Sequence, residues 1–341
     1  MLNNNPADVL AAAPDAIAMA LGERIANPHP LAADMAHNPL SALAAACAAK
    51  AQRPGSMVKA SWHTSQDFGV LLSAGVQEMI NRRFRAQAEH RRFCGELTLR
   101  NFKPVELPEI DLSDDLPVVG ELDEFGATYV GQPAQVRVDE VLRDVRLVTF
   151  GRLINISRQA VINDDIGLVA DMVAQMGNAI ARTEAKLLYQ ELEINPILMD
   201  NDRVFLTGFN KLAGALSETS LASGIAMMRK FKTKAGNDAD LAARHLVVAA
   251  ELELLARKLV HECNLPIEVT ASARLPAQRW YLFSDPEQHA ACAVLKLAAQ
   301  KNAVLVEPLK NIAIEGVAIR PRADLGAVIK GRMGSIRGGA D

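Results

Sequence analysis

The feature that most constrains the fold of this chain is a long segment, residues 106–134, with neither a helical nor a strand-like hydrophobic period. Prolines and glycines interrupt it at Pro108, Pro117, Gly120, Gly126, Gly131 and Pro133. Irregular segments of this length are uncommon inside compact domains and usually act outside the core. Alternating apolar residues flank it, with Leu97 and Leu99 before it and Val136 and Val138 after it. The sequence therefore predicts a long, open β-hairpin that extends from the body of the protein.

A single long helix is expected after the second arm of this hairpin. Asn163, Asp164 and Asp165 have short side-chain oxygens that can cap a helix by accepting its unpaired backbone N–H groups. Apolar residues then recur at helical spacing as far as about Gln190, at Ile166, Val169, Val173, Met176, Ile180 and Leu187. About 25 helical residues span roughly 38 Å. Asn195-Pro196 is expected to end the helix.

The rest of the chain mixes both kinds of element and predicts an α+β fold. A first helix is expected from about Asp67. Further helices are expected at Ser217–Lys230, Leu252–Cys263 and Glu287–Lys301. Strands are expected at Leu246–Val248, Ile267–Val269 and Trp280–Phe283, with an antiparallel pair at Ile312–Ile319 and Ala327–Ile329. The glycine-rich end, Gly331–Gly339, is expected to be a flexible tail.

Composition limits the class of protein. With 341 residues, 50% of them hydrophobic, the chain is long enough for roughly two domains. A net charge of −3 does not suit a general nucleic-acid binder, which needs a strongly positive surface. We expect no membrane span and no secretion signal, and therefore a protein made in the cytoplasm. The four cysteines are expected to be buried or half-buried free thiols: Cys47, Cys94, Cys263 and Cys292.

No arrangement of residues predicts catalysis, a metal site or a cofactor site. His63, Ser65 and Asp67 alternate within one segment, whereas the members of a catalytic triad converge from distant parts of a chain. His261-Glu262-Cys263 lacks the second histidine of a zinc-protease helix, and the phosphate-binding glycine motifs are missing. We therefore expect a protein that is not an enzyme.

Four short motifs follow one another along the chain: His63-Thr64-Ser65-Gln66-Asp67-Phe68, Asn101-Phe102-Lys103-Pro104, Thr149-Phe150-Gly151-Arg152 and Ile156-Ser157-Arg158-Gln159-Ala160-Val161-Ile162-Asn163-Asp164-Asp165. Together they resemble the Mu-like major head subunits of tailed bacteriophages and prophages. The last is the most specific, because ten residues in that order lead directly into the long helix. The resemblance covers about residues 62–335 and becomes weaker after Asn195. In many relatives, these capsid domains follow a fused protease and scaffold region.

The resemblance implies the tailed-phage (Hong Kong 97-type) major capsid fold. Residues 1–62 would form an N-terminal extension or arm, and residues 63–109 the N-terminal helix and the first part of the peripheral domain. The expected later parts are an extended loop (110–145), the rest of the peripheral domain (146–199) with a spine helix (163–191), a mainly axial domain (200–305), and C-terminal strands that return to the peripheral domain (306–341).

Two departures from the family pattern have consequences. Relatives usually carry His-Gly-Asn near the position of Gly208-Phe209-Asn210, where this chain has Phe209. The founding capsid of this fold cross-links its subunits through a lysine of the extended loop. Here no lysine occurs between Lys103 and Lys186, so we expect a shell without these covalent links.

By this resemblance, the protein is a structural capsid subunit of the virion, assembled in the bacterial cytoplasm. It would form hexamers and pentamers of an icosahedral head that encloses double-stranded DNA, which it would contact non-specifically. Scaffold and portal proteins would be partners, with a decoration protein as a further candidate. Two alternatives are an encapsulin-like compartment and a remnant of the fused maturation protease. Residues 1–60 are too short for a protease domain and contain no nucleophile motif.

Two charged segments are candidate assembly sites. Residues 106–124 contain eight carboxylates and no lysine or arginine, and five of the acidic residues are Asp114, Asp115, Glu121, Asp123 and Glu124. The opposite charge lies upstream, at Arg82, Arg83, Arg85, Arg91 and Arg92. We hypothesise that the acidic loop of one subunit lies over the arginines of the next and sets register more than affinity. The alternatives are that both segments are solvated faces, or that the arginines contact DNA.

Overall fold

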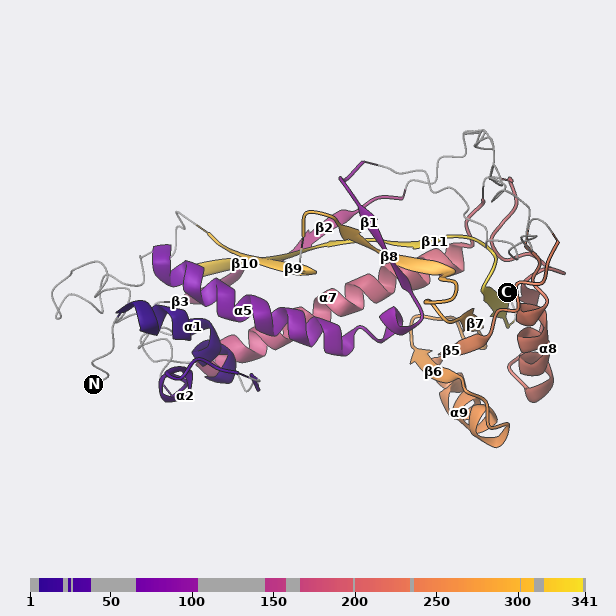
Figure 1. Cartoon of the computed structure of the whole chain (residues 1–341), viewed down its shortest axis with the longest axis horizontal. Helices are drawn as coiled ribbons and strands as arrows, with labels where there is room; N and C mark the ends of the chain where they lie inside the picture. Colours follow the sequence, from indigo (N-terminus) through magenta and orange to yellow (C-terminus); the bar gives the residue numbers. More distant parts are fainter. Residues whose placement is uncertain are drawn as a thin grey trace, which may run out of the picture. The chain divides into compact units, whose positions relative to one another are not determined.

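The computed structural model describes residues 6–20, 24–25, 27–37, 66–103, 145–157, 166–198, 200–233, 236–300, 302–309 and 316–339 (Figure 1). The chain divides into two compact units, each built from three stretches of sequence. The first unit comprises residues 1–88, 148–183 and 298–325, and the second comprises residues 89–147, 184–297 and 326–341. Both units contain helices and strands, which confirms the α+β class. The C-terminal stretch 306–341 contributes to both units, with the division after Leu325.

The first unit packs helices against a small antiparallel sheet. Its helices are α1 (Pro6–Ala20), α2 (Ala32–Met35), α5 (Gln66–Gln87) and the first part of α7 (Ile166–Ile194). Its strands are β2 (Val148–Gly151), β3 (Ile154–Ser157), β9 (Val304–Pro308) and β10 (Gly316–Leu325). The other three strands all pair antiparallel with β10, which is therefore the organising strand of this unit.

Side chains of α5 satisfy the backbone of β9. The amide of Asn81 donates to the carbonyl of Val304 at 3.0 Å and accepts from the N–H of Val304 at 3.1 Å. Gln77 accepts from the N–H of Val306 at 3.2 Å. The side chain of Asn81 is 1% exposed, and the N–H and carbonyl of Val304 would be costly to bury without a partner. The Asn81 amide supplies the hydrogen bonds that a neighbouring strand would otherwise make to them. This contact fixes the register of helix against sheet.

The long helix predicted by the apolar stripe is present as α7, whose 29 residues correspond to roughly 43 Å. It ends at Ile194, directly before Asn195-Pro196 as expected, and three residues after the end expected for the spine helix. The expected capping residues, Asn163, Asp164 and Asp165, lie outside the described part. Gly177 allows a close approach between α7 and α5, because a Cβ there would lie 2.7 Å from the Cβ of Arg83 and 3.0 Å from the carbonyl of Ile80.

The second unit contains two sheets. The larger has the strand order β4-β12-β7-β5-β6, with the bounds β4 (Lys211–Leu212), β12 (Ser335–Gly338), β7 (Trp280–Ser284), β5 (Ala243–Ala249) and β6 (Glu268–Ser272). The smaller has the order β1-β8-β11, with the bounds β1 (Gly95–Leu99), β8 (Cys292–Leu297) and β11 (Ala327–Ile329). Its helices are η2 (Glu89–Arg92), α8 (Glu218–Arg229), η3 (Ala250–Leu252), α9 (Glu253–Glu262) and the last part of α7.

The larger sheet is covered by hydrophobic side chains on both faces. Successive residues of a strand point to opposite faces. Trp280 and Leu282 of β7 therefore join one core, with residues of α8 and α9 such as Leu221 and Leu259. Tyr281 and Phe283 point to the opposite face and join the other core, with the end of α7 and with Phe93, which follows η2. This continuous burial explains why β5 and β7 could be predicted from uninterrupted apolar runs.

Three predictions for the C-terminal part were wrong. Glu287–Lys301 is not a helix, because Cys292–Leu297 form β8, which is inserted between β1 and β11. A short continuous apolar run does not distinguish a buried strand from a buried helix. Ile312–Ile319 and Ala327–Ile329 do not pair with each other, since β10 and β11 belong to different sheets. The predicted tail contains β12, a buried strand between β4 and β7.

Two further expectations are corrected or left open. Cys263 is exposed rather than buried or half-buried, while Cys94 and Cys292 are buried free thiols as expected and Cys47 lies outside the described residues. The strands at the two ends of the predicted hairpin, β1 and β2, do not pair with each other among the described residues: β1 pairs with β8, and β2 pairs with β10. Residues 104–144, which contain most of the hairpin, lie outside the described part.

Candidate assembly surfaces

The structure divides the five candidate arginines into two groups. Arg82, Arg83 and Arg85 lie in the last two turns of α5 in the first unit and are exposed. The guanidinium of Arg82 donates to the carbonyl of Arg24 at 3.1 Å. Arg91 and Arg92 lie in η2 of the second unit. The basic run therefore contributes to both units rather than to one continuous helix.

Arg91 is engaged inside its own subunit by a buried carboxylate. Its Nε and Nη2 atoms donate to the two oxygens of Glu184, each at 2.7 Å, and the Nε2 atom of His90 lies 2.8 Å from the same carboxylate. Glu184 is fully buried. Burial alone would raise its pKa, but the hydrogen bonds from Arg91 and His90 outweigh burial and hold the pKa below its ordinary value. A bidentate pair of this kind fixes geometry, so Arg91 acts as a structural anchor between η2 and α7.

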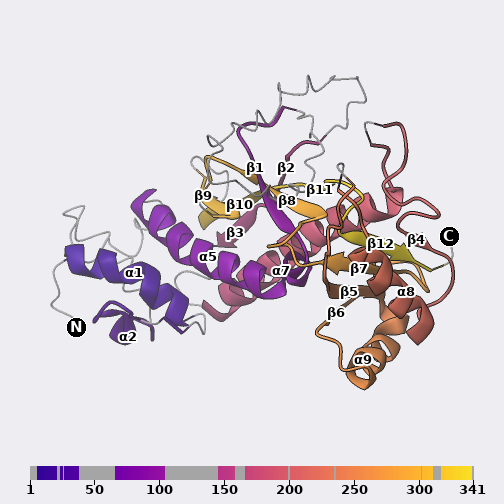
Figure 2. The same cartoon turned by 45° about the vertical axis from the view of Figure 1, so that its right-hand side comes forward.

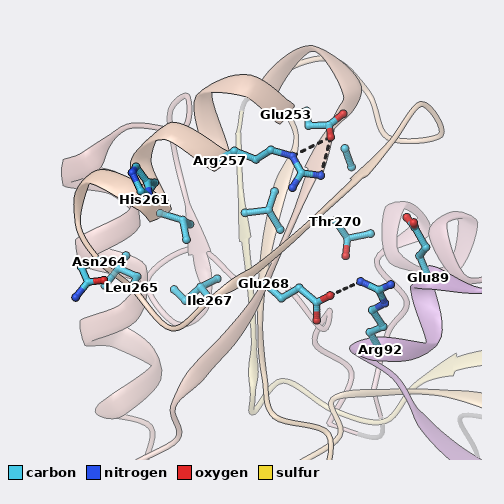
Figure 3. Close-up of a pocket in the computed structure, with 13 residues that line it drawn as sticks. Glu89, Arg92, Glu253, Arg257, His261, Asn264, Leu265, Ile267, Glu268 and Thr270 are labelled. Carbon is cyan, nitrogen blue, oxygen red and sulfur yellow. Dashed lines mark hydrogen bonds and ion pairs between the residues drawn. The ribbon is translucent and has the colours of Figure 1, made fainter.

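Arg92 instead faces a polar hollow of about 670 Å³ along the open edge of the larger sheet (Figure 3). The hollow is formed by η2, by α9 and by β6, which is the end strand of the sheet. Arg92 forms an ion pair with Glu268 of β6, and across the hollow the two guanidinium nitrogens Nε and Nη2 of Arg257 donate to Glu253 at 3.0 and 2.8 Å. His261 and Asn264 line the far end.

The chemistry of this hollow suits a polar contact surface. Four of its charged side chains form two ion pairs, Arg92 with Glu268 and Arg257 with Glu253, and each of these side chains is roughly half exposed. Exposed pairs of this kind contribute little stability, about 0–1 kcal/mol each.

A second, more apolar groove of about 430 Å³ lies beside α8, toward the β4 edge of the same sheet. We call it the Phe209 groove, and its lining residues are Gly208, Phe209, Ser223, Ala226, Met227, Lys230, Phe231 and Lys232. Phe209 stacks on Phe231 with ring centroids 5.5 Å apart and remains 42% exposed. The following residue, Asn210, is buried and donates to the carbonyls of Arg332 and Ser335, so it holds the loop before β12 in place. The chain therefore presents an exposed phenyl ring on a rigid support.

Helix α9 carries exposed leucines. Its buried face packs Ala256 and Leu259 into the core. Leu254 is 82% exposed and Leu255 is 38% exposed, in the first turn of the helix. Leu254 is therefore a candidate contact residue, because so large an apolar surface is left in water.

Sequence reasoning missed the residues that organise these surfaces. Glu184 continues the apolar stripe of α7 four residues after Ile180, and a lone carboxylate in such a stripe signals a buried, paired charge. Glu268 and Leu254 gave no such signal, because their exposure depends on the neighbouring elements. The predicted acidic residues, Asp114, Asp115, Glu121, Asp123 and Glu124, lie outside the described residues.

Two classes of site are not seen in the part of the chain that is described. No cluster of three or more histidine, cysteine, aspartate or glutamate side chains is placed to hold a metal ion. None of the described helices is long and apolar enough to cross a membrane.

The chain is similar to several solved structures at low sequence identity. The chain is similar to the virus-like particle from Pyrococcus furiosus, with 12% identity, a TM-score of 0.47, and coverage of 77% of this chain and 96% of that chain. It is also similar to the holo-SrpI encapsulin complex from Synechococcus elongatus, with 8% identity, a TM-score of 0.44, and coverage of 74% of this chain and 88% of that chain. For the procapsid of bacteriophage JBD30, the identity is 10%, the TM-score is 0.42, and the coverage is 80% of this chain and 76% of that chain. No curated protein matches the chain in sequence.

The family assignment depends on a sequence model. The model of a family described as phage capsid protein matches residues 140–337, more than half of the chain. This region contains α7, α8, α9, all the described strands except β1 and the last residue of β12, and the whole Phe209 groove. It agrees with the tailed-phage capsid fold implied by the four short motifs. The chain belongs to the phage capsid protein family.

Proposed function

We propose that this chain is a structural subunit that assembles with its own copies into hexamers and pentamers, which close into an icosahedral phage head around double-stranded DNA. The observation that carries the proposal is the family match over residues 140–337. A closed shell requires one subunit to present surfaces that complement those of its copies under a repeated symmetry operation. The exposed apolar residues of the second unit, Phe209 and Leu254, support this requirement.

The two units supply candidates for the two domains of a capsid subunit. We assign the first unit, with α5 and most of α7, to the peripheral domain, and the second unit, with the larger sheet, to the axial domain. The arm (1–62) and the extended loop (110–145) would reach neighbouring subunits. Scaffold and portal proteins would be partners during assembly, and a decoration protein would be a partner on the finished head.

The acidic segment 106–124 and the arginines form a second part of the proposal. The loop of one subunit would lie over Arg82, Arg83 and Arg85 of a neighbour, and over Arg92, whose ion pair with Glu268 is exposed. Arg91 is already paired with a buried carboxylate of its own subunit, so we expect it to contribute rigidity rather than a contact. Individual exposed pairs are worth about 0–1 kcal/mol, so the charges would select register while apolar contact supplies affinity.

This electrostatic contact can be tested by charge reversal. We expect the substitution of lysine at Asp114, Asp115, Glu121 and Glu124 to weaken assembly and to change its salt dependence. Restoring complementarity through Arg82→Glu, Arg83→Glu and Arg85→Glu in the same chain should recover part of the loss. Assembly and salt dependence unchanged by the four lysines would eliminate the contact.

The shell itself is tested by electron microscopy of the purified protein and by sedimentation at low and high salt. Closed shells, or discrete hexamers and pentamers, are the expected result. A monomer or dimer under every condition, even with the cognate scaffold protein, would contradict the proposal. Nucleic acid inside particles isolated from the host would support a phage head, whereas an enzyme cargo without DNA would indicate an encapsulin-like compartment.

A further inference from the structure

The Phe209 groove and the exposed leucines of α9 are two different apolar features on one sheet. The groove lies next to Lys211, the first residue of β4, and along α8, which packs on β12 and β7. Helix α9 packs on β6 and β5. Since the strand order is β4-β12-β7-β5-β6, the two features lie toward opposite edges of the sheet. Figure 2 shows α8 and α9 as separate helices of this unit.

Leu254 is poorly explained by the folding of one subunit. It is the most exposed of the large apolar side chains in the described part of the chain, at 82%. The core is already sealed on this side by Leu252, Ala256 and Leu259, which are all buried. Because burying a leucine gains free energy in proportion to the apolar area removed from water, a partner surface would provide what the subunit does not.

The groove has the properties of a receptor for such a side chain. Its floor includes the partly exposed ring of Phe209, stacked on Phe231, and the half-buried side chain of Met227. Gly208 has φ +86, a left-handed conformation that favours glycine and sets the direction in which Phe209 leaves the chain. A thioether beside aromatic rings can adapt to an incoming aliphatic side chain.

Each feature carries an exposed charge of opposite sign. Glu251 is exposed in η3, three residues before Leu254, whereas Glu253, directly before Leu254, is paired with Arg257. Lys230, which caps α8, is exposed at the groove, whereas Lys232 is paired with Asp238. Such rim charges help to select partner and orientation more than they add affinity.

We propose that Leu254 of one subunit inserts into the Phe209 groove of a second copy of the chain. The two patches differ and lie toward opposite edges of the sheet, so the contact is heterologous and repeats from copy to copy around a ring. This inference rests on the proposed function, since it specifies one lateral contact of the assembling subunit.

The test uses two cysteines that can be linked only between copies in this geometry. The background carries Cys263→Ser and Cys47→Ser, so that Cys94 and Cys292, both buried, are the remaining native thiols. Leu254→Cys is combined with Ala226→Cys, an exposed alanine of the groove, and the assembled protein is treated with a short bismaleimide. We expect a ladder of covalent species above the dimer on a denaturing gel. Each single-cysteine variant has one reactive site per copy and can give no species above the dimer.

A matched control moves the groove cysteine along the same helix. Thr219 is exposed on α8, seven residues and roughly 10 Å before Ala226, so Leu254→Cys with Thr219→Cys should lose the ladder. Wild-type shells in the microscope together with no ladder from the Leu254/Ala226 pair would overturn this contact and leave the proposed function standing. A wild-type protein that forms neither capsomers nor shells with its scaffold, and no ladder, would overturn both.

Discussion

Replacing Glu184 by glutamine should destabilise the second unit strongly, because the substitution removes the counter-charge of Arg91 at a fully buried position. Glutamine has nearly the same shape, but its NH₂ group would face an N–H donor of Arg91 or His90. Removing one partner of a buried ion pair typically costs about 3–5 kcal/mol. The side chain of Arg91 is 27% exposed and also contacts Glu96 at 3.1 Å, so we expect the lower end, about 3 kcal/mol.

The assay is urea unfolding followed by tryptophan fluorescence, under conditions where the chain is unassembled. The chain has two tryptophans, and Trp62→Phe leaves Trp280, which is fully buried in the second unit, as the reporter. Glu96→Gln is the matched control, since it removes a carboxylate from the same arginine at a position that is 53% exposed. We expect this control to cost no more than about 1 kcal/mol.

The pH dependence gives an independent check on the same residue. The pKa of Glu184 is lower in the folded chain than its ordinary value of 4.5, so its contribution to stability is present above pH 4.5. Below that pH the unfolded chain binds a proton first, and the contribution is lost as the pH falls through the folded pKa. The difference in unfolding free energy between wild type and Glu184→Gln should therefore shrink below pH 4.5. Equal losses for Glu184→Gln and Glu96→Gln at neutral pH would refute the buried-anchor interpretation.

Three other substitutions test the packing. Asn81→Leu should lower the stability of the first unit by about 2–3 kcal/mol, because the N–H and carbonyl of Val304 lose their partner; faster hydrogen exchange in β9 would report it. Gly177→Ala should lower the stability by about 1–2 kcal/mol, because the cost of overpacking exceeds the gain in helix propensity. A gain in thermal stability would contradict the close approach of α5 and α7. Gly338→Ala should lower the melting temperature and alter the fluorescence of Trp280, since its Cβ would lie 1.9 Å from that ring; unchanged melting and emission would argue against this contact.

The elements that the sequence predicted correctly have strong local patterns. The stripe that begins at Ile166 determined α7, and the periodic runs of α8 and α9 determined those helices within one residue at each end. Uninterrupted apolar runs bounded by turns identified β5 and β7. The family resemblance also came from local order, in the motif that ends at Asp165. These features depend on residues close in the chain, so one sequence contains the information.

Strand pairing between residues far apart in the chain could not be predicted from local patterns. β8 looks helical until β1, about two hundred residues earlier, lies parallel beside it. The tail after Gly331 looks flexible because its glycines are usually found in turns, yet Gly338 is required by the ring of Trp280. Only tertiary structure decides which surface covers a segment, and burial then overrides local preference.

The candidate sites also depend partly on local sequence and partly on tertiary structure. The sequence identified five arginines as one basic run, because charge is visible without a fold. Tertiary structure assigned Arg91 to a buried carboxylate 93 residues away, and left Arg82, Arg83 and Arg85 at the surface. It also decided that Leu254 is exposed, whereas Leu259 of the same helix is buried. The residue types are set by the sequence, but solvent exposure and the identity of each partner are properties of the folded chain.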